Sequence, residues 1–205
     1  MRIPRHIGII PDGNRRWAES KGLTKEKGYD MGLDPGMELL KLCKKEGIEE
    51  ISYYGFTVDN TKRPRFQREA FTESCIKAVK MLITEDVSLL VVGNYDSPMF
   101  PKELLPFTKR KTLGKGQIKV NFLVNYGWEW DLSSLKDNKT LNSSEISRID
   151  LIIRWGGRRR LSGFLPIQTV YSDFYIIDDY WPDFKEEHFY EALQWYNKQD
   201  ITLGG

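Results

Sequence analysis

The sequence predicts a single α/β domain with a largely parallel central sheet flanked by helices. Short apolar segments of strand length alternate along the chain with longer segments in which apolar residues recur every three or four positions. Polar motifs rich in glycine and arginine follow directly after several of the short apolar segments. No internal repeat or linker interrupts the 205 residues, so one domain spanning residues 1–205 is expected.

The first half of the chain supplies two strands and two helices. Residues 6–10 form a short apolar run that is typical of a buried strand, and residues 51–56 form a second one. Between them Met37, Leu40 and Cys43 recur at helical spacing, and a glycine follows as a helix C-cap would. A longer helix is predicted after the second strand from one apolar face, made of Phe71, Cys75, Ala78, Val79 and Leu82.

The middle of the chain predicts two more strands around a proline-containing segment. Residues 87–92 are an apolar strand candidate. Residues 99–112 are helical in part, but Pro101 and Pro106 limit how far a helix can run. Residues 118–124 alternate, which predicts a strand with one face more buried than the other.

The last third begins with a polar segment. Residues 133–147 are rich in asparagine and serine and lack periodicity, which predicts a surface loop or a partly disordered link. The strand pattern returns at residues 151–153 and 174–177. A final helix is predicted over residues 185–198, with three inward side chains: Phe189, Leu193 and Tyr196.

Composition narrows the classes of function. Hydrophobic residues make up 40% of the chain and aromatic residues 13%, which is typical of a folded globule. The net charge of +2 excludes a strongly basic nucleic-acid binder and leaves room only for a local basic patch. Cys43 and Cys75 lie in apolar helical patterns, so buried free thiols are expected. Neither a signal peptide nor a membrane-spanning segment is recognisable, so we expect a cytoplasmic protein with at most peripheral membrane contact.

The first candidate binding motif is Asp12-Gly13-Asn14-Arg15-Arg16-Trp17, directly after the first strand. Glycine lets a ligand approach the backbone, and the predicted start of a helix presents free N–H groups to an anion. Two arginines suit phosphate oxygens, and the aspartate suggests a bridging Mg²⁺ because it would otherwise repel a diphosphate. Taken alone, the motif is equally compatible with a plain turn that carries solvated arginines.

Two further cationic motifs follow later strands. One is Arg154-Trp155-Gly156-Gly157-Arg158-Arg159-Arg160-Leu161-Ser162, and the other is Asn60-Thr61-Lys62-Arg63-Pro64. In a parallel sheet the three motifs converge on one crevice, which indicates two bound diphosphates rather than one. Taken alone, the arginine loop could instead be solvated or bind RNA.

Several other kinds of site are not favoured. The sequence contains no Walker-type run, no GxGxxG and no Cys/His metal spacing. Only two histidines are present, which argues against a Ser-His-Asp hydrolase. His188 falls in the final helix pattern and is interpreted as structural, and His6 is assigned no role.

Together the motifs resemble those of the cis-prenyltransferase family, whose members make undecaprenyl diphosphate and dehydrodolichyl diphosphate. The resemblance implies a hydrophobic tunnel for a prenyl chain and a dimer. It also implies transfer of the group from an allylic diphosphate to isopentenyl diphosphate or another acceptor, with release of diphosphate. The matching segments run from residue 6 to residue 184 and are HIGIIPDGNRRWA, GFTVDNTKRP, VNFLVNYGWEWD, IDLIIRWGGRRRLSGFL and VYSDFYIIDDYWPDF.

The resemblance also implies roles for individual residues. Asp12 would hold Mg²⁺ on the allylic diphosphate, Asp173 would reach the metal in place of a family glutamate, and Asn60 would sit beside the reacting centre. The donor diphosphate would be cradled by Gly13, Asn14 and Arg16 with help from Arg63. The second diphosphate would be bound by Arg154, Arg160 and Ser162. The remaining substrate-binding candidates are Arg15, Trp17, Lys25 and Arg158.

The chain departs from the family pattern at several positions. Arg158 stands where an acid is usual, and Lys25 and Tyr29 stand where an arginine and a histidine are usual. Thr61 replaces a tryptophan and Gln67 a glutamate. The segment after Trp130 is shorter than in chain-elongating members, and the family's C-terminal Arg-x-Gly is missing.

Two interpretations follow from these departures. The first is an active but atypical homodimeric prenyltransferase, short-chain or non-head-to-tail, in which Arg158 supplies the cation of the missing arginine. The second is one subunit of a heteromeric enzyme that uses a partner's Arg-x-Gly. The retained substrate-binding residues favour the first. An RNA-binding module is a remote alternative that gives Asp12 no role, and the added cations leave strict dependence on Mg²⁺ open.

Overall fold

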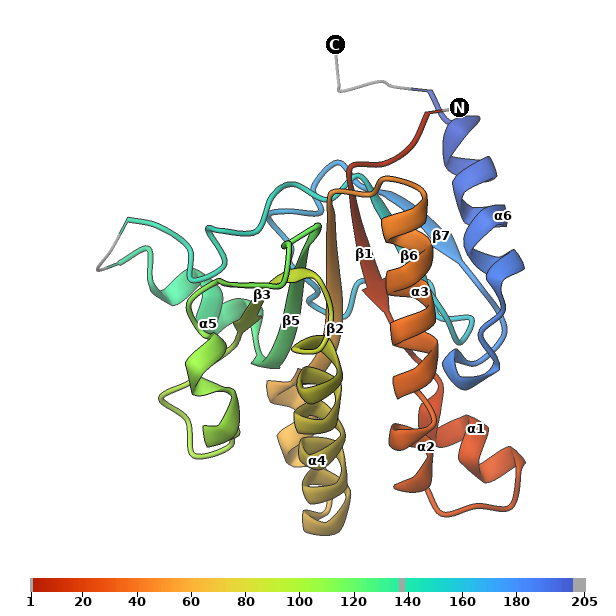
Figure 1. Cartoon of the computed structure of the whole chain (residues 1–205). Coiled ribbons are helices and arrows are strands. Elements are labelled where there is room, and N and C mark those ends of the chain that lie inside the picture. Colours follow the sequence, from red (N-terminus) through yellow and green to blue (C-terminus); the bar gives the residue numbers. More distant parts are fainter. Residues whose placement is uncertain (1, 137–138, 201–205) are drawn as a thin grey trace.

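The computed structural model describes residues 2–136 and 139–200, which build one mixed sheet with helices packed on it (Figure 1). The strand order is β4-β3-β5-β2-β1-β6-β7, and every neighbouring pair is parallel except β3 with β4. The predicted α/β class is confirmed. The strands are β1 His6–Ile10, β2 Glu50–Thr57, β3 Val87–Val92, β4 Lys111–Leu113, β5 Ile118–Tyr126, β6 Leu151–Arg154 and β7 Asp173–Ile176.

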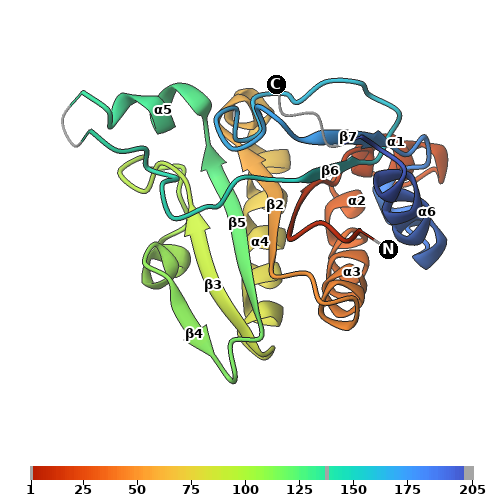
Figure 2. The same ribbon diagram turned by 90° about the horizontal axis from the view of Figure 1, so that it is seen from above.

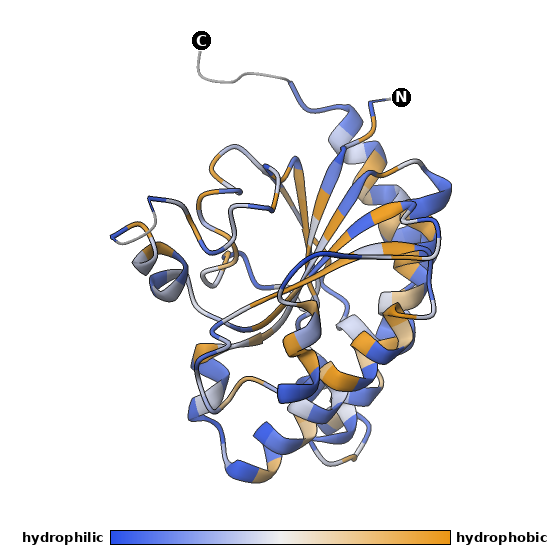
Figure 3. Cartoon of the chain, turned by 60° about the vertical axis from the view of Figure 1, so that its left-hand side comes forward, coloured by the Kyte–Doolittle hydropathy of each residue, from blue (hydrophilic) through white to orange (hydrophobic). Residues whose placement is uncertain are grey.

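The long helices pack on one face of this sheet (Figure 2). They bury the larger hydrophobic core against the strands, and their apolar sides face the sheet (Figure 3). The opposite face is covered mainly by irregular segments, which enclose a smaller core around Tyr126, Ile149 and Phe164. The helices are α1 Asn14–Ser20, α2 Lys27–Asp30, α3 Leu33–Lys45, α4 Arg65–Leu82, α5 Trp128–Ser133 and α6 Glu186–Asn197.

The strands that were predicted from short apolar runs are confirmed. Strands β1 and β3 have the predicted bounds, and β2, β6 and β7 agree within one residue. All five residues of β1 are buried because the strand pairs with β2 and β6 and has a covered face on each side. Cys43 and Cys75 are buried free thiols, as predicted. None of the helices in the described part of the chain is long and apolar enough to cross a membrane.

Two predictions for the middle of the chain need correction. Residues 99–112 contain a 3-10 helix, Lys102–Phe107, but also the short strand β4, which pairs antiparallel with β3. The strand predicted at residues 118–124 is confirmed, but its two faces differ in burial only at Lys119. Strand β5 lies between β3 and β2 with eight of its nine residues buried, and Lys119 is the exception. Polar residues are tolerated there because they are hydrogen-bonded, as Asn121 is to Glu50 and Ser52.

A buried carboxylate fixes the polar segment that was expected to be a surface loop or a partly disordered link. Asp131, at 2% exposure in α5, accepts hydrogen bonds from Tyr126 Oη at 2.8 Å, Ser143 N at 2.8 Å and Ser143 Oγ at 2.6 Å. Gln168 Nε2 donates to the same Ser143 hydroxyl at 2.8 Å. The network ties the end of β5 to the segment around residue 143, and Ile146 from this segment packs into the second core.

A second buried polar network lies at the amino ends of the central strands. His6 Nδ1 lies 3.1 Å from the Ser147 carbonyl oxygen and Nε2 lies 2.8 Å from Ser52 Oγ. A neutral ring that donates from Nδ1 and accepts at Nε2 satisfies both contacts. Burial lowers the pKa of His6, and the nearby Glu50 carboxylate opposes this shift only in part.

This network predicts that the protein is less stable at mildly acidic pH. The unfolded chain protonates His6 at its ordinary pKa, whereas the folded chain protonates it only at lower pH, so stability is lost as the pH falls below about 6.5. The expected contribution is at most about 1.4 kcal/mol per pH unit. We expect thermal unfolding between pH 7.5 and 5.5 to show a smaller fall in Tm for His6→Gln than for the unmodified protein. Equal slopes would contradict a neutral buried His6.

Candidate active site

A cavity of about 610 Å³ lies at the carboxyl ends of β2, β1 and β6, which are neighbours in the sheet. Because these strands are parallel, the segments that follow them leave the sheet at the same edge. All three predicted motifs line this cavity, so their convergence is confirmed. The predicted residues that line it are Asp12, Gly13, Asn14, Arg15, Arg16, Lys25, Asn60, Arg63, Arg154, Arg158, Arg160 and Ser162.

An ion-pair cluster centred on Asp12 joins the first and second motifs. Arg154 Nη2 donates to Asp12 Oδ2 at 2.8 Å, and Arg16 Nη2 lies 3.3 Å from the same oxygen. Desolvation would raise the pKa of Asp12, but the hydrogen bond from Arg154 and the charges of Arg154 and Arg16 outweigh it and hold the pKa below its ordinary value. Asp12 is therefore ionised at neutral pH.

The arginine loop after β6 is shaped by backbone in the left-handed region. Gly156, Gly157 and Gly163 have φ values of 84°, 70° and 78°, and Ser162 has 54°. Glycine adopts such values without cost, which explains the Gly-Gly pair. Arg154, only 3% exposed, braces the loop by donating to Ser162 Oγ at 3.1 Å and to the Arg160 carbonyl oxygen. The loop thereby turns Arg158 and Arg160 toward the cavity.

The first motif is held close to the wall of the cavity. A side chain at Gly13, which has a φ of 107°, would lie 2.7 Å from the Tyr180 ring, so only glycine fits. Asn14 Nδ2 donates to the Pro11 carbonyl oxygen at 3.1 Å, and Asn14 Oδ1 is buried without a hydrogen-bond partner in the described part of the chain. Such an orphaned acceptor is uncommon and calls for a ligand or an ordered water.

Several cationic side chains surround the mouth through contacts of their own. Arg63 Nη1 donates to Tyr29 Oη at 3.1 Å. Arg15 contacts Gln67 Oε1 at 3.4 Å, and Lys25 pairs with Glu19 at 3.0 Å. These contacts tie α1, α2 and α4 together around one opening.

Asn60 lines the cavity and also stabilises the start of a 3-10 helix. Its Oδ1 accepts a hydrogen bond from Thr57 N at 3.1 Å, and Thr57 Oγ1 accepts one from Asn60 N at 3.3 Å. The pair caps the 3-10 helix Val58–Lys62 in the manner of a capping box. The amide nitrogen of the side chain is left for the cavity.

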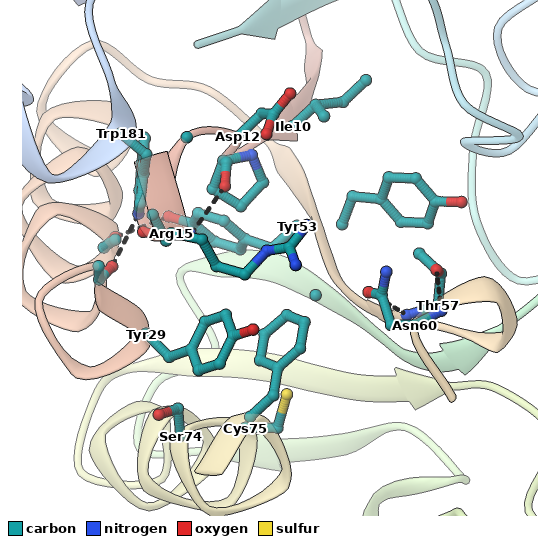
Figure 4. A pocket seen from close by; sticks show the side chains of 18 of the residues that line it. Ile10, Asp12, Arg15, Tyr29, Tyr53, Thr57, Asn60, Ser74, Cys75 and Trp181 are labelled. Atoms are coloured by element: carbon teal, nitrogen blue, oxygen red, sulfur yellow. Dashed lines mark hydrogen bonds between the residues drawn. The ribbon is translucent and has the colours of Figure 1, made fainter. Parts of the chain in front are cut away.

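Below the charged mouth the cavity continues as an apolar channel between the sheet and the helices (Figure 4). The channel follows one face of α4 for three turns, roughly 16 Å at the helical rise. Tyr53 and Trp181 also line it and are fixed by hydrogen bonds from Tyr53 Oη to Gly36 O at 2.7 Å and from Trp181 Nε1 to Gly32 O at 2.8 Å. The apolar lining includes Leu33, Met37, Phe71, Cys75, Ala78, Met81, Leu82 and Phe122.

Two predicted site residues are not part of the cavity. Trp17 packs inward from α1 and donates its indole N–H to Asp183 Oδ1 at 2.8 Å, so it orients the motif and does not line the cavity. Asp173 stands level with Leu151 and Ile7 at the amino end of the sheet and pairs with Arg2 at 3.3 Å. Asp12 follows the opposite ends of the strands, roughly 16 Å further along them. Within one chain, Asp173 therefore cannot share a metal with Asp12.

Aromatic residues of the site that the sequence did not predict include Tyr29, Tyr53 and Trp181. Tyr53 lies in a strand predicted to be buried, and nothing in its spacing distinguishes a cavity wall from a core residue. Trp181 follows a pair of aspartates beyond the last strand, which is the same edge of the sheet as the motifs and could have suggested it.

The site carries a strong excess of positive charge. Seven basic and three acidic side chains line the cavity, the acids being Asp12, Glu19 and Asp59. Such a surface suits a polyanion, and arginine binds phosphate oxygens well. The cationic mouth can bind the phosphate groups of an amphiphile, and the apolar channel can hold its hydrocarbon tail.

The residues fit a magnesium ion that is held mainly by a substrate. Both arginine contacts of Asp12 are made to Oδ2, which leaves Oδ1 for a cation. No group of three or more His, Cys, Asp or Glu side chains suited to a metal occurs within residues 2–136 and 139–200. Mg²⁺ commonly uses one or two carboxylates and completes its shell with substrate phosphates and water, so one carboxylate is sufficient here.

Comparisons with known proteins agree on the kind of protein. The family described as "Putative undecaprenyl diphosphate synthase" matches residues 10–204. An isoprenyl transferase of Shouchella clausii is 31% identical, with 100% of this chain and 90% of that protein covered. A farnesyl-diphosphate-specific ditrans,polycis-undecaprenyl-diphosphate synthase of Photorhabdus laumondii is 30% identical over 99% of this chain and 90% of its own. Among solved structures, lavandulyl diphosphate synthase of Lavandula x intermedia with dimethylallyl diphosphate has a TM-score of 0.81 at 22% identity, covering 99% of both chains, and so shares the fold.

Proposed function

The chain belongs to the undecaprenyl diphosphate synthase family, and on that basis we propose that it transfers the prenyl group of a short allylic diphosphate to a second, diphosphate-bearing acceptor. Its relatives are prenyl diphosphate synthases, so the chain is a transferase of prenyl groups in isoprenoid biosynthesis.

The observation that carries the proposal is the continuity of the cationic mouth with the apolar channel in one cavity. A free diphosphate would leave the channel empty, and a plain hydrocarbon would leave the excess positive charge of the mouth unbalanced. A prenyl diphosphate satisfies both, because its head matches the arginines and its tail matches the channel. We assign the donor head to Asn14, Arg16 and Arg63 and the donor tail to the wall formed by α3, α4 and β2.

The second diphosphate is assigned to the arginine loop. Arg154, Arg158, Arg160 and Ser162 reach the cavity from the β6 side, and Asp12 lies between this group and the donor cradle. The ion pair from Asp12 to Arg154 thus links the two halves of the site. Arg158 adds a cation to the acceptor half, which supports a second substrate that also carries a diphosphate.

The reaction is then a substitution at the allylic carbon. The C1–O bond of the donor breaks, and its electron pair leaves with the diphosphate oxygen. The π electrons of the acceptor alkene form the new bond to C1, and the acceptor then loses a proton to the departing diphosphate, which restores a double bond. Guanidinium groups already in place stabilise the charge that develops on the leaving diphosphate. The apolar channel excludes water, which would otherwise capture the allylic cation as an alcohol. When bound through Asp12, Mg²⁺ would supply further positive charge to the diphosphate.

The length of the channel supports short donors and products. Its apolar part runs roughly 16 Å along α4, which suits a few isoprene units rather than a long polyprenyl chain. The whole cavity, about 610 Å³, is of the size that holds a drug-sized ligand.

A dimer is also proposed, as the family resemblance implies. Exposed apolar side chains at Ile167, Val170 and Tyr171, with 52%, 63% and 57% exposure, supply a surface that a second copy would cover.

Product analysis tests the proposed function. Purified protein is incubated with Mg²⁺ and dimethylallyl, geranyl, farnesyl or geranylgeranyl diphosphate, with and without isopentenyl diphosphate. We expect a new prenyl diphosphate from the shorter donors only, and its absence with Asp12→Ala. The structure of the product identifies the linkage. A folded protein that binds diphosphates but shows no turnover with any donor would contradict a self-sufficient transferase and favour a heteromeric subunit.

A further inference from the structure

Tyr29 occupies the junction between the charged mouth and the apolar channel. Figure 4 shows it below Asp12 and Tyr53 and above Ser74 and Cys75. The side chain is only 5% exposed. A donor whose head lies at the mouth and whose tail lies in the channel must place its allylic carbons at this level.

The hydroxyl of Tyr29 has an unused donor. It accepts a hydrogen bond from Arg63 Nη1 at 3.1 Å, and no acceptor for its own hydrogen lies within reach among residues 2–136 and 139–200. A tyrosine hydroxyl can accept and donate at the same time, so its hydrogen remains available to a ligand that enters the cavity. A hydroxyl beside a guanidinium, facing a cationic cavity, is suited to donate to an anion.

The ring of Tyr29 is part of an aromatic wall. It stacks on Phe71 with ring centroids 4.6 Å apart and an interplanar angle of 9°. The Arg63 guanidinium lies 5.6 Å from the centre of the Phe71 ring, so the two rings and the arginine form one packed unit. Aromatic faces attract cations, and more strongly where water is excluded.

We propose that Tyr29 is a catalytic residue of the donor half, with its hydroxyl donating to the departing diphosphate and its ring, together with Phe71, facing the allylic carbons. The inference rests on the proposed function and adds a named donor and an aromatic surface to it.

In the step concerned, the C1–O bond breaks and both electrons pass to the diphosphate oxygen. The Tyr29 hydrogen bond strengthens as that oxygen gains charge, while the proton stays on the tyrosine. The positive charge left on the allylic carbons is attracted by the ring faces until the acceptor's π electrons close the new bond. Both interactions are stronger in the transition state than in the bound donor, so they increase kcat more than they decrease KM.

Tyr29→Phe tests the hydroxyl, because it keeps the stacked ring and removes one oxygen. We expect kcat to fall roughly tenfold to a hundredfold, as for loss of a hydrogen bond to a charged group. KM for the donor should change by less than about threefold. The inhibition constant of inorganic diphosphate should rise, because that product carries the full charge that the hydroxyl binds. The matched control is Tyr190→Phe, whose hydroxyl contacts Lys45 and Glu46 on the surface, and it should behave as the unmodified protein.

Phe71→Leu tests the aromatic wall, since it keeps an apolar side chain and removes the ring face. We expect kcat to fall about threefold to thirtyfold with unchanged affinity for inorganic diphosphate. If Tyr29→Phe retains wild-type kcat and diphosphate inhibition, the role of the hydroxyl is wrong. If Phe71→Leu retains wild-type kcat, the role of the ring is wrong. An unmodified protein without any prenyl transfer would instead overturn the proposed function, so the two failures are distinguishable.

Discussion

Replacing Asp12 by asparagine is expected to lower kcat by about a thousandfold. Asparagine keeps the shape of the side chain but removes the negative charge that pairs with Arg154 and Arg16 and that is assigned to Mg²⁺. Loss of one such electrostatic group commonly costs a factor of about 10² to 10³, and here the orientation of two arginines is lost as well. Steady-state rates with excess donor measure the effect.

A control and a stability measurement make this result specific. Asp96→Asn removes an exposed carboxylate in a turn and should leave kcat unchanged. Asp12→Asn also leaves Arg154 without its counter-charge, so thermal unfolding is compared in parallel to show that the variant is folded at the assay temperature. A folded Asp12→Asn variant within tenfold of wild-type kcat would argue against a central role for this carboxylate.

Replacing Asp131 by alanine is expected to lower the free energy of unfolding by about 3–4 kcal/mol. The carboxylate accepts three hydrogen bonds, and its removal leaves the Tyr126 hydroxyl and the Ser143 backbone N–H buried without partners. Asp131→Asn should cost less, because its carbonyl oxygen can still accept from Ser143 N. Urea unfolding of the two variants gives the comparison.

Ser143→Ala is the matched control for this network, since it removes one hydroxyl and keeps the backbone donor. It removes two hydrogen bonds, one to Asp131 and one from Gln168, so its expected cost is about 2 kcal/mol. A cost for Asp131→Ala no larger than that of Ser143→Ala would mean that water replaces the carboxylate and that the segment around residue 143 is not held by it.

The fold could be predicted wherever burial on two faces produced an unbroken apolar run. Strands β1 and β3 are such runs and have the predicted bounds. Strand β5 was predicted, but the difference in burial between its faces is smaller than expected, because Asn121 is buried and hydrogen-bonded to Glu50 and Ser52. The short elements β4 and α5 depend on partners distant in sequence, so local patterns gave no sign of them.

The convergence of the three motifs could be predicted, because it follows from the parallel order of the strands. Parallel strands bring the segments after β1, β2 and β6 to one edge, and the three motifs converge for that reason. The prediction that Asp173 reaches the metal is wrong within one chain. The strand predicted at residues 174–177 already placed Asp173 before a strand, and so at the edge of the sheet opposite to Asp12. The contact between Tyr29 and Arg63 depends on how α2 packs against α4, which spacing along the sequence does not encode.

The face of α4 that lines the channel carries side chains at successive depths, which would set how far the proposed hydrocarbon tail can reach. Phe71, Cys75, Ala78 and Leu82 follow one another along α4 at intervals of about one turn, or roughly 5.4 Å. A larger side chain at any one of these four positions would block the channel at a different depth. A smaller side chain at Leu82 would lengthen the channel. Asp12 and the arginines of the mouth lie outside α4, on β6, α1 and the segments that follow the strands, so such changes leave them in place. If the proposed function holds, product length and bond formation depend on different residues, and each could change without the other.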